Sequence, residues 1–248
     1  MSKTFADLGL TSQLLDSLNE AGFVNPFPIQ EAVIPLALTG ADIIGQAKTG
    51  TGKTLGFGLP LLNNVNPGNG KAIALVVVPT RELAAQVNDA ARKYGKFIRA
   101  RTVSIVGGMP YPLQNKLLSQ PIDILVATPG RLIDHMERGR IDMSRLQMLV
   151  LDEADRMLDM GFMPDIEHIC AALPAERQNL LFSATFDPSI VRVAQEILHN
   201  PKRIEIAAQT QKHENIEQRL HYVDDMSHKN KLLEHLLIDP EVNQTIIF

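Results

Sequence analysis

Short apolar runs alternate with amphipathic segments along most of this chain. The runs are rich in Val, Ile and Leu, and several contain no polar residue, which is typical of strands buried on both faces of a parallel sheet. They predict seven strands, at residues 42–46, 72–78, 102–106, 123–127, 148–151, 179–183 and 203–206.

The segments between these runs predict helices. One covers residues 80–97 with Thr80 as its N-cap, and another covers residues 188–198, opened by Asp187 and a proline in the first turn. Alternating strands and helices predict a doubly wound α/β fold, with a central, mainly parallel sheet flanked by helices. In such folds ligands bind at the carboxyl ends of the strands.

The pattern changes after Ile206. Residues 207–215 are polar and lack periodicity, so we expect a linker between a first domain, residues 1–206, and a second, residues 216–248. The second domain begins with a predicted strand (216–223), a helix (227–239) and a strand (244–248). Because the chain stops on an apolar run, we expect this domain to be truncated.

Composition limits the function only loosely. The 248 residues are 45% hydrophobic and 21% charged, as in ordinary globular proteins, and the net charge of −4 means that nucleic-acid binding would need a local basic patch. The single cysteine, Cys170, excludes an internal disulfide and fits a reducing compartment. The chain has no membrane-length apolar run and no signal-peptide core at its start, so we expect a cytoplasmic protein that does not bind membranes.

A glycine-rich loop follows the first predicted strand and precedes a helix-like run, residues 55–62. The sequence AKTGTGKT, residues 47–54, has Ala47 where the strict phosphate-loop pattern has glycine. Glycines let successive N–H groups point inward, and the helix N-terminus adds a positive end, which together suit phosphate oxygens. We therefore expect a nucleotide with Mg²⁺, with Lys53 at the β- and γ-phosphates and the Thr54 hydroxyl on the metal. The phosphate-binding residues are Thr49, Gly50, Thr51, Gly52, Lys53 and Thr54.

Three carboxylates end the fifth predicted strand, in LVLDEAD, residues 149–155. They could simply mark a strand end and favour the dipole of a following helix. A phosphate-loop enzyme, however, needs a carboxylate on a nearby strand end to hold its metal, which gives Asp152 that role and makes Glu153 the base that activates water. Asp155 is either a third member of the site or a solvated acid at a helix start.

Five motifs occur in a fixed order: AKTGTGKT, PTRELA at 79–84, TPGR at 128–131, DEAD at 152–155 and SAT at 183–185. In these motifs the chain resembles the DEAD-box RNA helicases. The resemblance implies a complete RecA-like P-loop NTPase domain followed by the opening of a second one. It implies an ATP hydrolase and ATP-dependent RNA helicase that uses ATP and Mg²⁺. The second domain's RNA-binding and arginine-finger motifs are missing, so we expect this chain alone, as a monomer, to bind nucleotide but not to unwind RNA.

The resemblance assigns the adenine contacts. Gln30, in GFVNPFPIQ, corresponds to the family's adenine-sensing glutamine, and Phe5 to an isolated aromatic that stacks on the base. A glutamine amide can pair with adenine N6 and N7. Two alternatives stay open: Phe5 as a plain core residue, and Gln30 as a surface residue of the helix that starts at Pro28.

The resemblance also assigns an RNA groove, in which single-stranded or duplex RNA is held by its sugar–phosphate backbone. Arginine forks and exposed backbone N–H groups suit phosphate oxygens, so binding should ignore sequence and depend on salt. Arg81 could instead be an exposed charge at a helix start. The groove residues are Pro79, Thr80, Arg81, Gly107, Gly108, Thr128, Pro129, Gly130 and Arg131.

The SAT motif should link the two sites. The resemblance predicts that Ser183 and Thr185 hydrogen-bond Asp155 and so couple nucleotide state to RNA grip, whereas alone the motif would be a strand end before Pro188. Two other functions stay possible at this point. One is a DNA helicase or translocase, and the other is an ATP-gated RNA clamp whose slow hydrolysis serves partner assembly.

Overall fold

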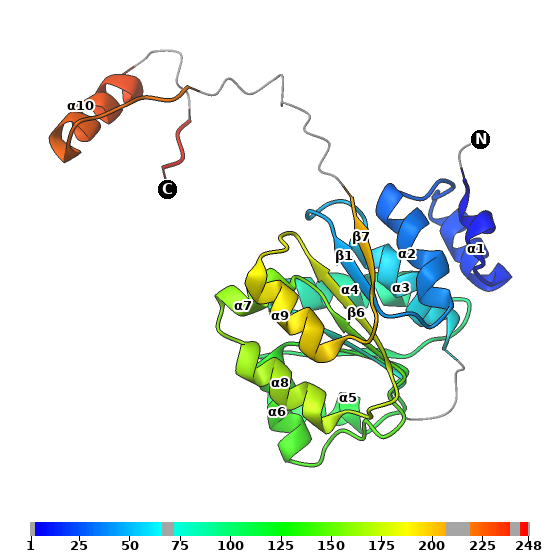
Figure 1. Cartoon of the computed structure of the whole chain (residues 1–248). Coiled ribbons are helices and arrows are strands. Elements are labelled where there is room, and N and C mark those ends of the chain that lie inside the picture. Colours follow the sequence, from blue (N-terminus) through cyan, green and yellow to red (C-terminus); the bar gives the residue numbers. More distant parts are fainter. Residues whose placement is uncertain (1–2, 66–71, 207–218, 239–243, 248) are drawn as a thin grey trace. The chain divides into compact units, whose positions relative to one another are not determined.

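The chain divides into two compact units, residues 1–208 and 209–248. The computed structural model describes residues 3–65, 72–206, 219–238 and 244–247. The first unit is a parallel sheet with helices on both faces (Figure 1). The predicted linker at 207–215 lies outside the described residues.

Every predicted strand of the first unit is present. The seven strands form one sheet in the order β3-β4-β2-β5-β6-β1-β7, and all six strand pairs are parallel. The prediction of a mainly parallel α/β fold is therefore confirmed. The strands are β1 (Ile43–Gln46), β2 (Ala74–Val77), β3 (Thr102–Ile105), β4 (Ile124–Ala127), β5 (Met148–Leu151), β6 (Gln178–Ser183) and β7 (Lys202–Glu205).

The helices cover the sheet on two faces, and each strand contributes alternate side chains to the two cores. In β5, Val150 packs into the core shared with α2, α3 and α4, whereas Leu149 and Leu151 pack into the core shared with α6 to α9. Both cores are mainly aliphatic, as expected for a doubly covered sheet. The helices are η1 (Phe5–Leu8), α1 (Ser12–Glu20), α2 (Pro28–Leu38), α3 (Lys53–Asn63), α4 (Arg81–Tyr94), α5 (Tyr111–Leu118), α6 (Pro129–Glu137), α7 (Ala154–Asp159), α8 (Met163–Ala172) and α9 (Pro188–Ile197).

The strand order brings three loops together. β6 lies between β5 and β1, with Leu181 level with both Leu151 and Ile44. Since all three strands are parallel, the segments that follow them leave the same edge of the sheet. At the β1–β6 contact, a Cβ built on Gly45 would lie 2.5 Å from the Phe182 ring, so a larger residue there would push the two strands apart.

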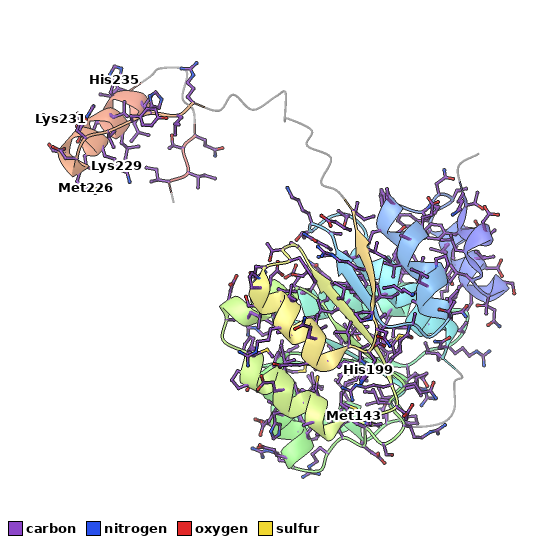
Figure 2. All side chains as sticks on the ribbon, in the orientation of Figure 1. Met143, His199, Met226, Lys229, Lys231 and His235 are labelled. Carbon is purple, nitrogen blue, oxygen red and sulfur yellow. The ribbon has the colours of Figure 1, made fainter. Side chains whose placement is uncertain are left out.

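The second unit contains one described helix, α10 (Met226–Leu237), close to the predicted helix at 227–239. Its N-cap, Asp225, accepts a hydrogen bond from His228 N, and Figure 2 shows its side chains, none of which is buried. The two strands predicted in this unit are not observed in their described parts, residues 219–223 and 244–247. A strand needs a neighbour for its backbone hydrogen bonds, and neither segment has one among the described residues. No described helix is both long and apolar enough to span a membrane.

Candidate functional site

The loop between β1 and α3 has the shape of a phosphate cradle. Gly50 and Gly52 adopt φ of +85° and +86°, a left-handed conformation that side chains rarely tolerate. Ala47, where the strict pattern has glycine, is buried, and its N–H donates to the Ser183 carbonyl at 3.0 Å. Thr51 closes the turn by donating to the Lys48 carbonyl at 2.7 Å. The loop is therefore fixed on one side to β6, and Thr49 lies on its open side.

Lys53 is the first residue of α3 and its side chain is almost fully buried. Its Nζ lies 4.0 Å from Asp152 Oδ1 and has no hydrogen-bond partner among the described residues. An ammonium group has three donors, and leaving them unpaired in a buried site is costly. This lysine is therefore poised to receive an anionic ligand. Thr54 follows in the first turn of the same helix.

Asp152 stands directly after β5 and is 2% exposed. Burial raises its pKa to about 6 despite the opposing charge of Lys53, and the nearby charges of Glu153 and Asp155 add to the rise. Its Oδ1 accepts the Glu153 N–H at 2.9 Å. The carboxylate thus lacks enough positive charge around it, which a cation would supply.

Glu153 has a backbone conformation that is rare for a residue with a side chain, with φ of +55°. It caps α7, and its Oε2 lies 3.5 Å from Arg156 Nη1 with no hydrogen-bond partner in the described part of the chain. The carboxylate lines a cavity of about 300 Å³. The other lining residues are Thr49, Lys53, Asp155, Arg156, Asp159 and Ala184.

Asp155 connects α7 to the segment after β6. Its Oδ2 accepts hydrogen bonds from Ala184 N at 3.1 Å, Thr185 N at 3.1 Å and Thr185 Oγ1 at 3.3 Å. The predicted contact with Thr185 is present. The predicted contact with Ser183 is wrong, because the Ser183 Oγ is buried without a partner among the described atoms. Past a strand end the backbone N–H groups lose their ladder partners, so the backbone supplies the donor expected from that hydroxyl.

A second group of predicted residues lies after β2, β3 and β4. Thr80 caps α4 by accepting Leu83 N at 3.2 Å, and Arg81 follows on the surface. A Cβ built on Gly108, which has φ of +80°, would lie 2.5 Å from Arg81 Nη1. Arg131, in the first turn of α6, donates to the Met109 carbonyl at 2.8 Å. The loop at 107–109 thus runs between two guanidinium groups.

The remaining residues of this group hold the loop in place. Thr128 is the N-cap residue of α6, and its Oγ1 accepts the Gly107 N–H at 3.4 Å. Pro129 is buried at the start of that helix, Pro79 is buried after β2, and Gly130 is exposed. The structure therefore brings all nine predicted groove residues to the ends of three neighbouring strands.

The model of the DEAD/DEAH box helicase family matches residues 27–193, two thirds of the chain. The chain belongs to this family.

Two curated relatives of this DEAD/DEAH box helicase domain are named as ATP-dependent RNA helicases. It is 44% identical over 246 residues to the DEAD-box ATP-dependent RNA helicase RhpA of Helicobacter pylori strain B128, covering 99% of this chain and 49% of that protein. It is 43% identical to the ATP-dependent RNA helicase DeaD of Escherichia coli K12, covering 99% of this chain and 39% of DeaD. The chain thus spans half or less of the length of these curated relatives.

Two solved structures also resemble this chain. A DEAD box protein from Methanococcus jannaschii superimposes with a TM-score of 0.79 at 36% identity, covering 97% of this chain and 65% of that one. A hypothetical ATP-dependent RNA helicase from Sulfolobus tokodaii gives 0.73 at 38% identity, covering 79% and 57% of the two chains. The RecA-like fold of the DEAD-box proteins is therefore the fold of the first unit.

The burial of Phe5 and Gln30 bears on the two predicted adenine contacts of this DEAD/DEAH box domain. Phe5 is 2% exposed and packs in the core, which supports the core alternative over stacking on a base. Gln30 is 1% exposed, so it is not a surface residue of α2. Its Nε2 donates to the Gly52 carbonyl at 3.0 Å and its Oε1 accepts Phe27 N at 2.9 Å, which leaves one N–H and one lone pair of the amide for a ligand.

Three residues at these sites were not found from the sequence. Phe27 is 51% exposed, and its ring lies 2.8 Å from a Cβ built on Gly52, at the lip of the phosphate loop. Arg156, in α7, pairs with Glu153, the N-cap residue three positions before it, a spacing that the sequence does contain. Tyr111 contacts Arg131, which lies 20 positions further along the chain, and no local pattern marks that pair.

Proposed function

We propose that this chain is the ATP- and Mg²⁺-binding half of an ATP-dependent RNA helicase, which couples ATP binding and hydrolysis to the clamping and local unwinding of RNA. One observation carries the proposal: the Lys53 ammonium, which has no hydrogen-bond partner among the described residues, lies 4.0 Å from the buried Asp152 carboxylate, and Lys53 lines a cavity beside the phosphate loop. Family membership agrees with it.

Each residue has one task in this proposal. The loop N–H groups and Lys53 bind the β- and γ-phosphates, and Glu153 orients the attacking water and accepts its proton. Arg156, 3.5 Å from Glu153, holds that carboxylate in place. Asp155 transmits the nucleotide state to Ala184 and Thr185. Gln30 uses its free N–H and lone pair on the adenine edge.

The residues present fit a magnesium ion. No group of three or more acidic, His or Cys side chains clusters for a metal among the described residues, but Mg²⁺ at a nucleotide needs only one or two protein oxygens beside the phosphates. The under-compensated Asp152 carboxylate and the Thr54 hydroxyl would supply those oxygens. When bound, the ion neutralises charge that develops on the phosphoryl group.

The RNA contacts are backbone contacts. The Arg81 and Arg131 guanidinium groups and the Gly108 N–H group suit phosphate oxygens of single-stranded or duplex RNA, without reading bases. Binding should be tolerant of sequence and weaken steeply with salt. The single cysteine favours a reducing compartment, so we also propose a cytoplasmic location. We further propose that this chain is a monomer.

The test compares this chain with a full-length protein that carries the second domain, in RNA-stimulated ATPase and duplex-unwinding assays. The full-length protein should hydrolyse ATP and separate strands, whereas this chain should bind nucleotide and do neither. Glu153→Gln should lower full-length ATPase by at least about 100-fold and leave nucleotide affinity nearly unchanged. Intact ATPase in Glu153→Gln would refute the role of Glu153 as the base.

The same assays separate the two other functions. Stimulation by DNA rather than RNA would indicate a DNA helicase or translocase. Long-lived RNA complexes with an ATP analogue, without strand separation, would indicate an ATP-gated clamp.

A further inference from the structure

Tyr111 lies at the centre of a cluster of charged side chains beside the 107–109 loop. It is the first residue of α5, and its ring faces the guanidinium groups of Arg131 in α6 and of Arg138, the C-cap residue of α6, with the two Cζ atoms 4.3 Å and 5.0 Å from the ring centroid. Its hydroxyl donates to Asp134 Oδ2. The ring also packs at 5.6 Å against His135, which is fully buried.

The single carboxylate of this cluster, Asp134, pairs with Arg138 and not with Arg131. Asp134 is three residues from Arg131 on α6, a spacing that favours an ion pair. Its carboxylate is instead occupied by Arg138 Nε at 2.8 Å and by the Tyr111 hydroxyl. Among the described residues Arg131 pairs with no carboxylate, and it donates only to the Met109 carbonyl. Its positive charge therefore remains available to an anion.

The Met109 carbonyl is itself well fixed. It accepts a second hydrogen bond from Gln114 Nε2 at 2.8 Å, and Gln114 is fully buried in α5. Arg131 is thus held at two points, by a rigid carbonyl and by the face of an aromatic ring. A guanidinium group held in this way loses less conformational entropy when it binds a phosphate.

We propose that Tyr111 is a positioning residue for RNA binding. Its ring sets the plane of the Arg131 guanidinium, and its hydroxyl, together with Arg138, keeps Asp134 from neutralising that charge. The inference rests on the proposed function, in which Arg131 contacts an RNA phosphate. The competing explanation is that Tyr111 only covers the buried His135.

The experiment measures binding of this chain to a fluorescent oligouridine RNA of about ten nucleotides, over a range of salt concentrations. Tyr111→Leu keeps apolar cover over His135 but removes both the ring and the hydroxyl, and should weaken binding about fivefold. Tyr111→Phe keeps the ring and should weaken it about twofold. Arg131→Met should reduce the slope of log affinity against log salt concentration by about the amount that one phosphate contact contributes, and Tyr111→Leu should reduce it by a similar amount.

A double-mutant cycle tells positioning from packing. Adding Tyr111→Leu to Arg131→Met should produce no further loss of RNA affinity, because Tyr111 acts through Arg131. A further fivefold loss in that background, or an unchanged affinity in Tyr111→Leu alone, would overturn the proposal. Phe97→Leu is the matched control: Phe97 is exposed and lies 5.3 Å from Lys96 Nζ, a similar cation–aromatic pair away from the groove, and its loss should leave RNA affinity unchanged.

A second readout does not depend on RNA. In an NMR spectrum, the Arg131 Nε–H resonance should carry a ring-current shift that persists in Tyr111→Phe and disappears in Tyr111→Leu. If the unmodified chain fails to bind RNA while this shift behaves as expected, the proposed RNA contact fails but Tyr111 still positions Arg131. If Tyr111→Leu leaves the resonance unchanged, the positioning role is wrong whatever the RNA result.

Discussion

Two parts of the carboxyl edge of the sheet, which we call the nucleotide edge and the arginine edge, treat their polar groups in opposite ways. At the nucleotide edge, formed by the ends of β1, β6 and β5, the Lys53 ammonium and the Glu153 Oε2 are buried without hydrogen-bond partners among the described residues. At the arginine edge, formed by the ends of β2, β4 and β3, Arg81 is exposed to solvent and Arg131 already donates to Met109.

The difference indicates how each edge meets its ligand. Buried polar groups without partners raise the free energy of the ligand-free state, and a ligand that pairs them recovers that energy. Groups that are already paired or hydrated gain less from each contact, so the arginine edge must rely on several weak contacts and on its preformed shape. Substitutions at the nucleotide edge should therefore have the larger effects.

The largest effect should come from Lys53→Met, which removes the buried ammonium. We expect affinity for a fluorescent ATP analogue to fall by about 100-fold or more, because a buried charge pair with the phosphates is lost. Lys48→Met is the control, since Lys48 is exposed in the same loop, and it should change affinity by less than about threefold. Equal losses in both variants would mean that net charge, and not the buried site, binds the nucleotide.

The next effect concerns the link between α7 and the segment after β6. Asp155→Asn replaces a carboxylate that accepts three hydrogen bonds at one oxygen, and should lower the free energy of unfolding by about 2 kcal/mol. Ser183→Ala should change it by less than about 0.5 kcal/mol, because the Ser183 Oγ has no partner in the described structure. Urea unfolding measures both. A large loss of unfolding free energy in Ser183→Ala would indicate that the predicted hydrogen bond between Ser183 and Asp155 exists.

At the arginine edge the expected effects are smaller. Gly108→Ala places a side chain at φ of +80° and 2.5 Å from Arg81 Nη1, which should cost about 1 kcal/mol of stability. RNA affinity should fall about threefold, since Arg81 must move. Gly107→Ala is the matched control, because nothing lies within 4 Å of its Cβ position. Thermal melts and RNA titrations should separate the two; similar behaviour would show that the loop is not as tightly fixed as its geometry indicates.

The sequence predicts the sheet because burial dictates it. Strands covered on both faces must be apolar throughout, so β2 and β5 are recognisable without their neighbours. The predicted strands at 216–223 and 244–248 show the limit of that reasoning, because their described residues, 219–223 and 244–247, form no strand. A pattern of apolar residues indicates that a segment could form a strand. The strand forms only where a neighbouring segment supplies its backbone hydrogen bonds.

At the sites, local chemistry is predictable and long-range contacts are not. The Gly50 and Gly52 conformations and the Thr80 cap depend on adjacent residues, and both appear as the motifs indicate. The burial of Phe5 and the contact of Tyr111 with Arg131 depend on how distant segments pack. Residue type at one position contains no information about that packing, so only the structure gives it.

The smallest expected effect concerns His135, an exception to the pairing or exposure of polar groups at the arginine edge. His135 is fully buried, and neither ring nitrogen has a partner among the described residues. Burial, and then the charges of Arg131, Arg138 and Arg140, lower its pKa below the ordinary value, although Asp134 opposes this. The unfolded chain therefore takes up a proton at a higher pH than the folded one, and stability should fall as the pH drops below about 6.5.

His135→Phe removes this titration and should reduce the loss of stability between pH 7.5 and 5.5, measured by urea unfolding. Asp152, with its raised pKa, acts in the opposite direction over the lower part of this range, but it is present in both proteins and cancels from the difference. His168→Gln, at an exposed position on α8, is the matched control. If His135→Phe and the unmodified chain lose equal stability on acidification, His135 is protonated or solvated in the folded state. The arginine edge would then contain no uncompensated buried histidine, and the contrast between the two edges would be sharper.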